Sequence, residues 1–460
     1  MKSVTREEGV SPPGVSPAAG VTGQSALPYR FVAWNFCAIV FDVAFWTAGM
    51  ACMDVGAVLP VFVSTLTDSK LLIAFLGTLP GVGWTLPQLL GAAKVMHRPR
   101  KKGYVLGMAL VGRTPMLILP VVLLLFPPQS KAVMLWALVG CYGVLFLSDG
   151  LIGAAWYDII AKTIPPRMRG RFFAGFSVVG GIGAVGSGWL VREVLASARF
   201  AYPRQYGVLF ACLCAGLFLS LVLLAFIREP EGVVSSESPQ PVREVLKQVP
   251  RVWRSSSHLR RLLVVSWLGM IAALGWPFYV LHGLDTLHLP AAAVAIFIWA
   301  TTAGSVGGSL VFAWLNDRRG PRSVVVLVSG MRPMAPAFAL LVPMALALFP
   351  RPVPAAVAQY IYAIVFLFGG ALMSGGMMGF SNYLLELAPE RERPLYVGLG
   401  NTLSAPGLMA PLLGGWLASV WSYEGMFAIG TVVGVASLIA SFWLRNPDAE
   451  DAPAQQNGGA

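Results

Sequence analysis

The sequence predicts an all-α integral membrane protein in which twelve transmembrane helices form two six-helix bundles. Three observations support this prediction. Of the 460 residues, 56% are hydrophobic and only 12% are charged, whereas soluble domains carry about 25% charged residues. The mean hydropathy is +0.70, and apolar runs repeatedly reach the roughly 20 residues that a helix needs to span a bilayer. A basic turn between two apolar runs also occurs a second time, about half the chain length further along.

The apolar runs define the expected spans in two sets of six. The first set covers residues 34–64, 71–94, 104–126, 132–160, 172–196 and 206–227. The second set covers residues 261–283, 291–315, 323–349, 355–385, 395–420 and 425–444. We therefore expect an amino-terminal bundle at 29–228, a cytoplasmic linker at 229–260 and a carboxy-terminal bundle at 261–445. Residues 1–28 and 446–460 lack an apolar core and are expected to be disordered cytoplasmic tails.

The positions of Lys and Arg predict the orientation in the membrane. These residues cluster in short loops on alternate sides, and the richer loops lie on the side of both termini. The positive-inside rule then places both termini in the cytoplasm and the protein in the cytoplasmic (inner) membrane. The same rule accounts for the net charge of +12 better than nucleic-acid binding does. The five cysteines all fall in apolar runs, which favours small buried side chains over a disulfide framework.

Repeated segments indicate that the two halves are copies of one unit. The turn "IPPRMRGRFFAG" at 164–175 aligns without a gap with "LAPERERPLYVG" at 387–398. Similarly, "IREP" at 227–230 returns as "LRNP" at 444–447. Transporters built from parallel repeats place their substrate site between the halves, near the bilayer midplane, and rock one half against the other. The repeats therefore predict a pseudo-twofold relation between the bundles.

The loop "NDRRGPRS" at 316–323 resembles the signature of the major facilitator superfamily of secondary transporters. Asp317, Arg318, Gly320 and Arg322 match its pattern of Asp, Arg, Gly and basic residues. In that family the loop ties cytoplasmic helix ends together through charge pairs. The equivalent loop at 96–103 departs from the pattern, because a His stands where the Asp is expected. The resemblance covers residues 30 to 445 and implies the superfamily fold and a permease function.

Two carboxylates inside apolar runs are candidates for substrate binding or proton coupling. A charged residue at the centre of a span costs about 2.5–3.5 kcal/mol, so such residues are functional candidates by default. Asp54 and Asp149 fall near the midplane, and the resemblance implies that their helices line the central cavity. A carboxylate in a low-dielectric site can exchange protons near neutral pH. It could also balance a cationic substrate, or it could pair with a buried Arg.

Arg113 and Arg332 are the candidate buried or cavity cations. Each lies just before a Pro, whose ring removes one helix hydrogen bond. A guanidinium can donate to the carbonyls freed by that defect, so we favour a structural role for both. We expect Asp42 or Asp149 to be the partner of Arg113, whereas the sequence indicates no acid for Arg332.

Two further sets of residues are assigned by their positions. The cytoplasmic gate and loop charges are expected to be Asp158, Arg169, Arg171, Asp317, Arg318, Gly320, Arg322, Glu386, Arg391 and Arg393. Within this set, the two acids at helix ends are expected to pair with the arginines of the repeated turns. Residues expected to line the cavity in the second half are Trp267, Trp276, Asn382, Tyr383 and Asn401.

These observations predict a secondary active transporter that moves a small organic solute by rocker-switch alternating access, coupled to protons. The alternatives are a passive uniporter and a non-transporting sensor on the same scaffold. An enzyme is not expected, because there are only four His, with no metal-ligand cluster inside a span and no soluble domain for a cofactor. The expected partners are a small-molecule substrate, membrane lipid and protons, with no nucleic acid, no metal and no cofactor, and a monomer is expected. The substrate, the direction and the choice among symport, antiport and uniport stay open at this point.

Overall fold

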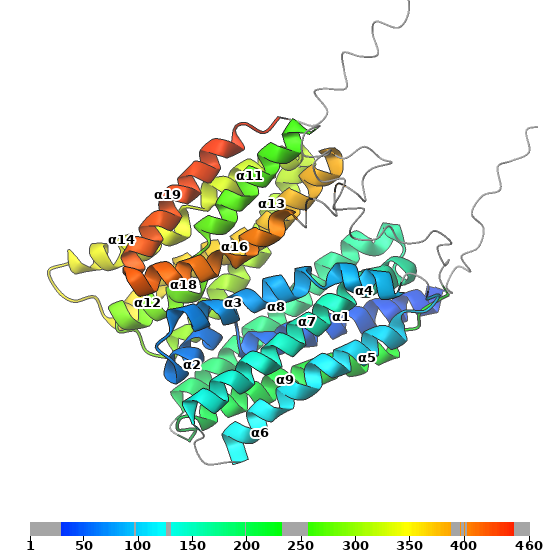
Figure 1. Ribbon diagram of the computed structural model, residues 1–460, viewed down its shortest axis with the longest axis horizontal. Helices are drawn as coiled ribbons and strands as arrows, with labels where there is room; N and C mark the ends of the chain where they lie inside the picture. The colour runs from blue at the N-terminus through cyan, green and yellow to red at the C-terminus, as the bar shows by residue number, and fades with distance from the viewer. Residues whose placement is uncertain are drawn as a thin grey trace, which may run out of the picture.

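The structure is a computed structural model that describes residues 29–95, 98–125, 130–197, 199–231, 256–387, 396, 400 and 403–445. Across these residues the regular secondary structure is entirely helical, and the helices form two bundles (Figure 1). The all-α membrane fold predicted from the sequence is therefore confirmed. The two expected tails and most of the expected linker lie outside the described residues.

The amino-terminal half runs from the first helix to the residue before the linker. Its elements are α1 (Tyr29–Cys52), α2 (Val58–Leu66), α3 (Lys70–Thr85), α4 (Gln88–Val95), α5 (Lys102–Arg113), η1 (Thr114–Leu117), α6 (Ile118–Leu125), α7 (Lys131–Thr163), α8 (Pro166–Ala196) and α9 (Arg204–Phe226). Three expected spans are interrupted, giving the pairs α1–α2, α3–α4 and α5–α6. Pro87 and Pro115 stand at two of these interruptions, where a ring in place of an N–H removes a helix hydrogen bond.

The carboxy-terminal half repeats this plan. Its elements are α11 (Ser257–Ala272), η2 (Trp276–Phe278), α12 (Tyr279–Thr286), α13 (Ala293–Met331), α14 (Met334–Ala347), α15 (Ala355–Tyr362), α16 (Ile364–Leu387), η3 (Ala405–Met409), α18 (Ala410–Val420) and α19 (Tyr423–Ser441). The interruption between α11 and α12 corresponds to the one between α1 and α2, as expected for a duplicated unit.

The number of membrane crossings follows from helix length. Ten helical stretches of the described chain are long and apolar enough to cross a bilayer, and one of them, Ala293–Ala347, has 55 residues. At 1.5 Å per residue such a stretch is about 80 Å long, which is far more than a hydrocarbon core of about 30 Å. It therefore holds two crossings, and the shorter apolar helix Ala405–Val420 adds another. The described residues thus contain the twelve crossings predicted from the sequence.

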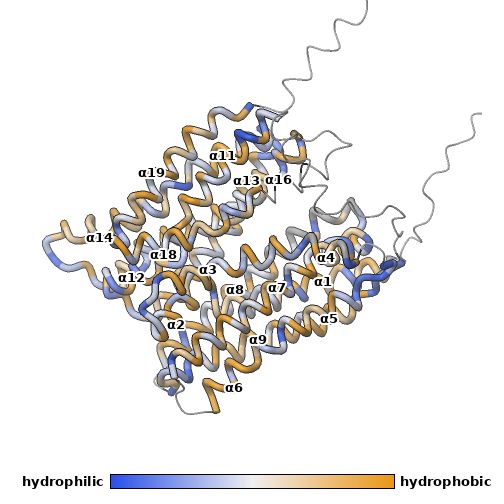
Figure 2. Tube along the Cα trace, in the orientation of Figure 1, coloured by the Kyte–Doolittle hydropathy of each residue, from blue (hydrophilic) through white to orange (hydrophobic). Residues whose placement is uncertain are grey.

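The outer surface of both bundles suits a lipid environment. Large apolar side chains such as Leu125, Trp136, Leu310 and Trp443 are more than half exposed. Figure 2 shows hydrophobic residues along the outer sides of the helices and hydrophilic residues gathered toward the helix ends. Exposed apolar area on this scale would drive aggregation in water, but it matches the acyl chains of a bilayer.

The two halves contact each other mainly through four of their helices. Most of this contact is α3 against α18 and α8 against α13. Within each half the helices pack extensively, for example α1 against α8 and α9, and α13 against α16. In Figure 1 the bundles lie together at the end that carries α2 and α12, and they diverge toward the end where α1 begins and α19 ends. The molecule is thus closed at one end of its long axis.

The turn in the motif at 316–323 depends on a glycine. Gly320 has φ 75° and ψ 170°, which separates the two helices that run through α13. This region of backbone space is essentially restricted to Gly, because a Cβ collides with neighbouring backbone atoms. Pro321 then starts the next helix with its fixed φ. The backbone conformation of this turn therefore requires Gly320, in addition to its match to the family motif.

We predict that Gly320→Ala lowers the free energy of unfolding by about 1–3 kcal/mol, because Ala must adopt a strained backbone conformation. The measurement is the thermal unfolding midpoint of the purified protein in detergent. Gly307→Ala in the same helix is the matched control. A Cβ at Gly307 meets no atom within 4 Å, and Ala is the better helix former. Equal midpoints for the two variants would contradict the role assigned to Gly320.

Candidate functional site

Asp54 lies at the break between α1 and α2. Its Oδ1 accepts a hydrogen bond from the Gly56 N–H at 2.9 Å, and its carbonyl oxygen accepts one from the Leu59 N–H at 2.9 Å. Asp54 therefore closes a tight turn and places its carboxylate beside the amino-terminal end of α2, where the helix dipole favours negative charge. The sequence predicted one continuous helix here. The pair Asp54 and Gly56, both turn-forming residues, is the signal that could have located the break.

The same turn touches the other half of the molecule. A Cβ on Gly56 would lie 2.7 Å from the indole ring of Trp276. On its other side this indole lies against Gly369, where an added Cβ would be 2.0 Å from the ring. Trp276, predicted to line a cavity, is therefore packed between the two halves. Asp54 is partly buried and lies two residues from this contact.

Other contacts between the halves lie on the same side of the molecule. Lys70 donates to the carbonyl oxygen of Ala418 at 2.9 Å, and its ammonium group lies 4.2 Å from the ring centroid of Tyr423. The indole N–H of Trp299 donates to the Val185 carbonyl at 2.9 Å. These residues come from helix ends opposite to the basic loops. The halves thus meet on the side predicted to face outward.

Asp149 lies elsewhere, inside the amino-terminal half. Its residue is 5% exposed, and both Asp149 and Asp42 lie near Arg113. Arg113 Nη1 donates to the Leu217 carbonyl at 2.7 Å, and Asp42 Oδ1 accepts a short hydrogen bond from the Ser220 hydroxyl. The structure thus brings together both acids proposed as partners of Arg113. We call Asp42, Arg113 and Asp149 the buried triad.

Two atoms of the buried triad are left without hydrogen bonds from the described residues. They are Asp149 Oδ2 and Arg113 Nε. Two carboxylates share one guanidinium, so the triad has more acidic than basic groups. It lies away from the contacts between the halves, which distinguishes Asp149 from Asp54. Only the tertiary structure could separate these two acids, because both fall at mid-span in the sequence.

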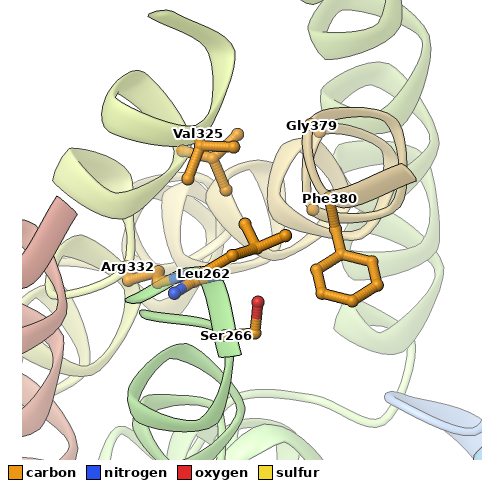
Figure 3. A pocket seen from close by; sticks show the side chains of 9 residues that line it. Leu262, Ser266, Val325, Arg332, Gly379 and Phe380 are labelled. Atoms are coloured by element: carbon orange, nitrogen blue, oxygen red, sulfur yellow. The ribbon is translucent and has the colours of Figure 1, made fainter. Parts of the chain in front are cut away.

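Arg332 occupies the corresponding place in the carboxy-terminal half. Its Nη1 donates to the Val265 carbonyl and to the Ser437 hydroxyl, the latter at 2.6 Å. The side chain fills the space beside Gly269, where an added Cβ would lie 1.7 Å from the guanidinium carbon. This answers a question that the sequence left open, because a carbonyl and a hydroxyl hydrogen-bond Arg332. Arg332 also lines a pocket, shown in Figure 3.

The cytoplasmic charges of the first half form a compact network. The predicted pairing of Asp158 with the arginines of the repeated turn stays a prediction, because the side chain of Arg169 lies outside the described residues. Among the described residues, Asp158 pairs with Lys101 at 2.9 Å and with Lys162 at 2.6 Å. The reason is geometric, since Lys162 lies one turn away on the same helix. Glu229, which sequence reasoning did not single out, accepts from the backbone N–H groups of Lys101 and Lys102 and so caps α5. Its place in the repeated "IREP" segment could have drawn attention to it.

The motif residues of the second half are arranged differently. Asp317 is exposed, and the guanidinium of Arg318 lies 4.9 Å from the ring centroid of Trp314. Arg322 donates through Nε to the Leu444 carbonyl at 2.7 Å, which ties the motif to the end of α19. Of the other predicted gate residues, Arg171 and Glu386 are both exposed. Arg391, Arg393, Asn401 and the side chain of Arg169 lie outside the described residues.

Three residues predicted to line a cavity instead join helices within the second half. The Trp267 indole donates to the Leu403 carbonyl at 2.8 Å, and Asn382 donates to Asn316 at 3.2 Å. Tyr383 is fully buried, and its hydroxyl donates to the Arg445 carbonyl at 2.7 Å. Tyr383 therefore belongs to a packed core and not to a cavity surface, because a phenol can satisfy its one polar atom while its ring is buried.

The sequence matches the family profile described as Major Facilitator Superfamily over residues 36–408. The chain belongs to the major facilitator superfamily. Solved structures with the same fold include a D-xylose–proton symporter, with a TM-score of 0.65 and 14% identity, covering 91% of this chain and 99% of that one. The nucleoside transporter NupG gives a TM-score of 0.63 and 15% identity, covering 89% and 99% of the two chains.

A relative in sequence is an uncharacterized protein of Mycobacterium tuberculosis strain H37Rv. It is 23% identical over 438 residues, which cover 92% of this chain and 80% of the relative. Family membership and the apolar helices make this chain a multi-pass membrane protein.

We predict that Arg113→Gln strongly destabilises the protein, by about 3–5 kcal/mol, because it leaves two carboxylates buried without their cation. The measurement is the yield of monodisperse protein in detergent and its unfolding midpoint. Adding Asp149→Asn to this variant removes one of the stranded acids and should restore part of the loss. Arg351→Gln, at an exposed position, is the control that changes the net charge equally. A midpoint of Arg113→Gln that equals the control would rule out the buried triad as a stabilising unit.

Proposed function

We propose that this superfamily member is a secondary active transporter that moves a small organic solute across the cytoplasmic membrane by alternating access, coupled to protons. The observation that supports this function best is the contact between the halves at one end, with Asp54 beside it. An acidic side chain within a span costs free energy, so such side chains are usually paired or functional. Asp54 lies at a helix break, next to the surface where the halves must move.

The surface between the halves is suited to opening and closing. Glycines allow close approach at several of its contacts, including Gly181 against Thr302 and Gly415 against Ala74, while Trp276 packs against Gly56. Close backbone approach through small residues allows rigid bodies to separate and meet again. Few hydrogen bonds between described residues cross this surface, and one of them runs from Lys70 to the Ala418 carbonyl.

The orientation predicted from the basic loops makes this conformation inward-facing. The bundles diverge toward the end where α1 begins and α19 ends (Figure 1), and Arg322 of the motif donates to the Leu444 carbonyl just after α19. Asp317 is exposed there, as expected if its loop forms interhelical charge pairs only when that end closes. The second conformation would then separate Lys70 from Ala418 and bring the cytoplasmic ends together.

Proton coupling would follow from a change in the exposure of the Asp54 carboxylate to water when the halves move. Withdrawal of Trp276 from Gly56 would expose the adjacent carboxylate to water, so its proton affinity would differ between the two conformations. A group whose proton affinity depends on conformation couples protons to that conformation by linkage. The buried triad is the second place for a proton, since its two acids share one cation.

The alternating-access part of the proposal is tested without knowing the substrate. A Cβ at Gly181 lies 3.4 Å from a methyl carbon of Val306, so Gly181→Cys with Val306→Cys should form a disulfide in a background lacking the native cysteines. Spin labels at Arg100 and Arg319, both exposed, report the distance between the cytoplasmic ends. We expect two distance populations before oxidation and only the longer one after it, with recovery on reduction.

The matched control for this experiment is Gly186→Cys with Val306→Cys. A Cβ at Gly186 meets no atom within 4 Å, so this pair should not cross-link and should keep both distance populations. A single unchanged distance before and after cross-linking of the 181–306 pair would refute alternating access.

Proton coupling is tested in proteoliposomes with the solutes named for transporters of the same fold, namely D-xylose, nucleosides, short peptides and 5-aminolevulinic acid. One coupled proton sustains about tenfold accumulation per pH unit, since a pH unit is worth about 1.4 kcal/mol. We expect an uncoupler to abolish accumulation of the transported solute. Asp54→Asn should abolish accumulation while leaving exchange down a gradient.

Asp68→Asn is the control, because Asp68 is an exposed acid in the same half and should transport like the native protein. Flux that is indifferent to pH in both the native protein and Asp54→Asn would instead identify a passive uniporter.

A further inference from the structure

His282 of α12 is a buried histidine at the end where the two halves meet (Figure 1). It is 1% exposed, and its Nδ1 lies 2.9 Å from the Tyr362 hydroxyl of α15. That hydroxyl donates its single proton to the Tyr279 carbonyl at 2.9 Å. The phenol oxygen must therefore accept a hydrogen bond from Nδ1–H of the imidazole, because its own proton is already used. Neutral His282 thus carries its proton on Nδ1 and leaves Nε2 bare.

The bare nitrogen lies near a carboxylate. Nε2 of His282 is 3.9 Å from Oε1 of Glu424, whose side chain is 59% exposed. Glu424 belongs to the first turn of α19, where the helix dipole favours a negative charge. A second proton on the imidazole would go to Nε2, since Nδ1 already has one. Protonation would therefore replace a lone pair beside a negative oxygen with an ion pair between α12 and α19.

The same end of α19 holds a cation of the other half. The Lys70 ammonium group of α3 lies 4.2 Å from the ring centroid of Tyr423, and this ring centroid is 5.9 Å from that of the His282 imidazole. Glu424 is the next residue along the chain, and its carboxylate and that of Asp285 both lie near Lys70. Lys70 is thus held to the carboxy-terminal half by an aromatic ring and by negative charge.

A proton on His282 changes the balance of a small set of charges. The titratable side chains around it that the structure describes are Tyr279 and Asp285 of α12, the exposed His288 just after α12, Tyr362 of α15, Tyr423 and Glu424 of α19, and Lys70 of α3. The segments η2, α2 and α14 also contact α12 and contain no titratable side chain. Within this set, Lys70 faces two carboxylates while His282 is neutral.

We propose that His282 is a proton-sensitive switch of the contact between the halves on the outward side. While His282 is neutral, Glu424 attracts Lys70 and helps to hold this end closed. Protonated His282 pairs with Glu424 and adds a positive charge near Lys70, which weakens the attraction of Lys70 to the carboxy-terminal half. Acid on the outward side therefore favours the conformation that is open there. This inference rests on the alternating access of the proposed function, but not on Asp54 or on the transported solute.

The switch is tested by the distance between the outward ends of the halves as a function of pH. Spin labels are placed at Ala132 of α7 and Ala355 of α15, both exposed, in the full-length protein without its native cysteines, in lipid nanodiscs. His changes its charge between about pH 5 and pH 8. We expect the ratio of the longer to the shorter distance to rise about two- to fivefold over this range on acidification, as suits the loss of one exposed ion pair. A ratio that is constant, or that falls in acid, would overturn the proposal.

Two variants assign the response to the pair of His282 and Glu424. His282→Gln keeps a side-chain N–H for the Tyr362 hydroxyl but cannot gain a proton, so its distance ratio should not depend on pH. Glu424→Gln changes a largely exposed side chain, so its folding should be unaffected. It removes the partner of the protonated imidazole and should lose most of the response. A full response in either variant would overturn the proposal.

His288→Asn is the matched control, because His288 is a second, exposed histidine at the same end. Its φ is 50°, a conformation that Asn tolerates better than most residues. This variant should keep the full response to pH. Loss of the response in His288→Asn together with its persistence in His282→Gln would assign the switch to the wrong histidine and refute the proposal.

Lys70→Met tests the contact on which the switch acts. Met keeps an unbranched side chain without the charge, so this variant should favour the longer distance already at about pH 8 and respond little to acid. A response as large as that of the native protein would break the proposed link between His282 and Lys70.

The cytoplasmic label pair at Arg100 and Arg319 separates this inference from the proposed function. Two cytoplasmic distances together with an outward ratio that ignores pH would refute the switch alone. A single distance for both label pairs at every pH would refute alternating access and the switch together.

Discussion

The architecture depends on one constraint, which is that a polar group within the hydrocarbon core must find its partner inside the protein. The helices satisfy most backbone groups, but the interruptions at Asp54, Pro87 and Pro115 free some of them. At Asp54 the side chain itself binds the freed N–H of Gly56. At Pro115 the neighbouring Cys141 thiol donates to the proline carbonyl at 3.2 Å. At these two interruptions a side chain thus adds a hydrogen bond to the irregular backbone.

The same constraint explains why the two halves, built on one plan, differ in their interior charges. In the first half, Asp42 and Asp149 lie near Arg113, so this cation has acidic partners within the protein. In the second half, Arg332 donates to Val265 and Ser437, and a small pocket lies beside it. Duplication kept the cation and its helix geometry, while the acidic partners diverged. The cation of the first half thus has acidic neighbours, whereas the described neighbours that hydrogen-bond the cation of the second half are neutral.

The contact between the halves places an acid, Asp54, next to the surface along which the halves would move. Gly56, Gly181 and Gly415 allow close approach, so at these positions the halves contact each other with no side chain on the glycine's side. Trp276 is the largest group between them, and it lies next to the turn of Asp54. A rearrangement that separates the halves must change the surroundings of this turn more than those of the buried triad. This makes Asp54 the acid most directly linked to the relative position of the halves.

The sequence by itself determined the helical membrane class, the number of crossings and their division into two related sets. Hydrophobicity, loop charge and the repeated basic turn are properties of the chain that need no contacts. The sequence also identified Arg113 with its two possible acids, because charges within apolar runs are rare and must pair. Only the tertiary structure decided which mid-span acid lies at the contact between the halves and which is buried with Arg113. It likewise decided that Lys101 and Lys162 pair with Asp158, that Tyr383 is in a core, and that Arg332 borders a pocket. The physical reason is that depth in the membrane follows from position along a helix, whereas the direction in which a side chain faces follows from how the helices pack.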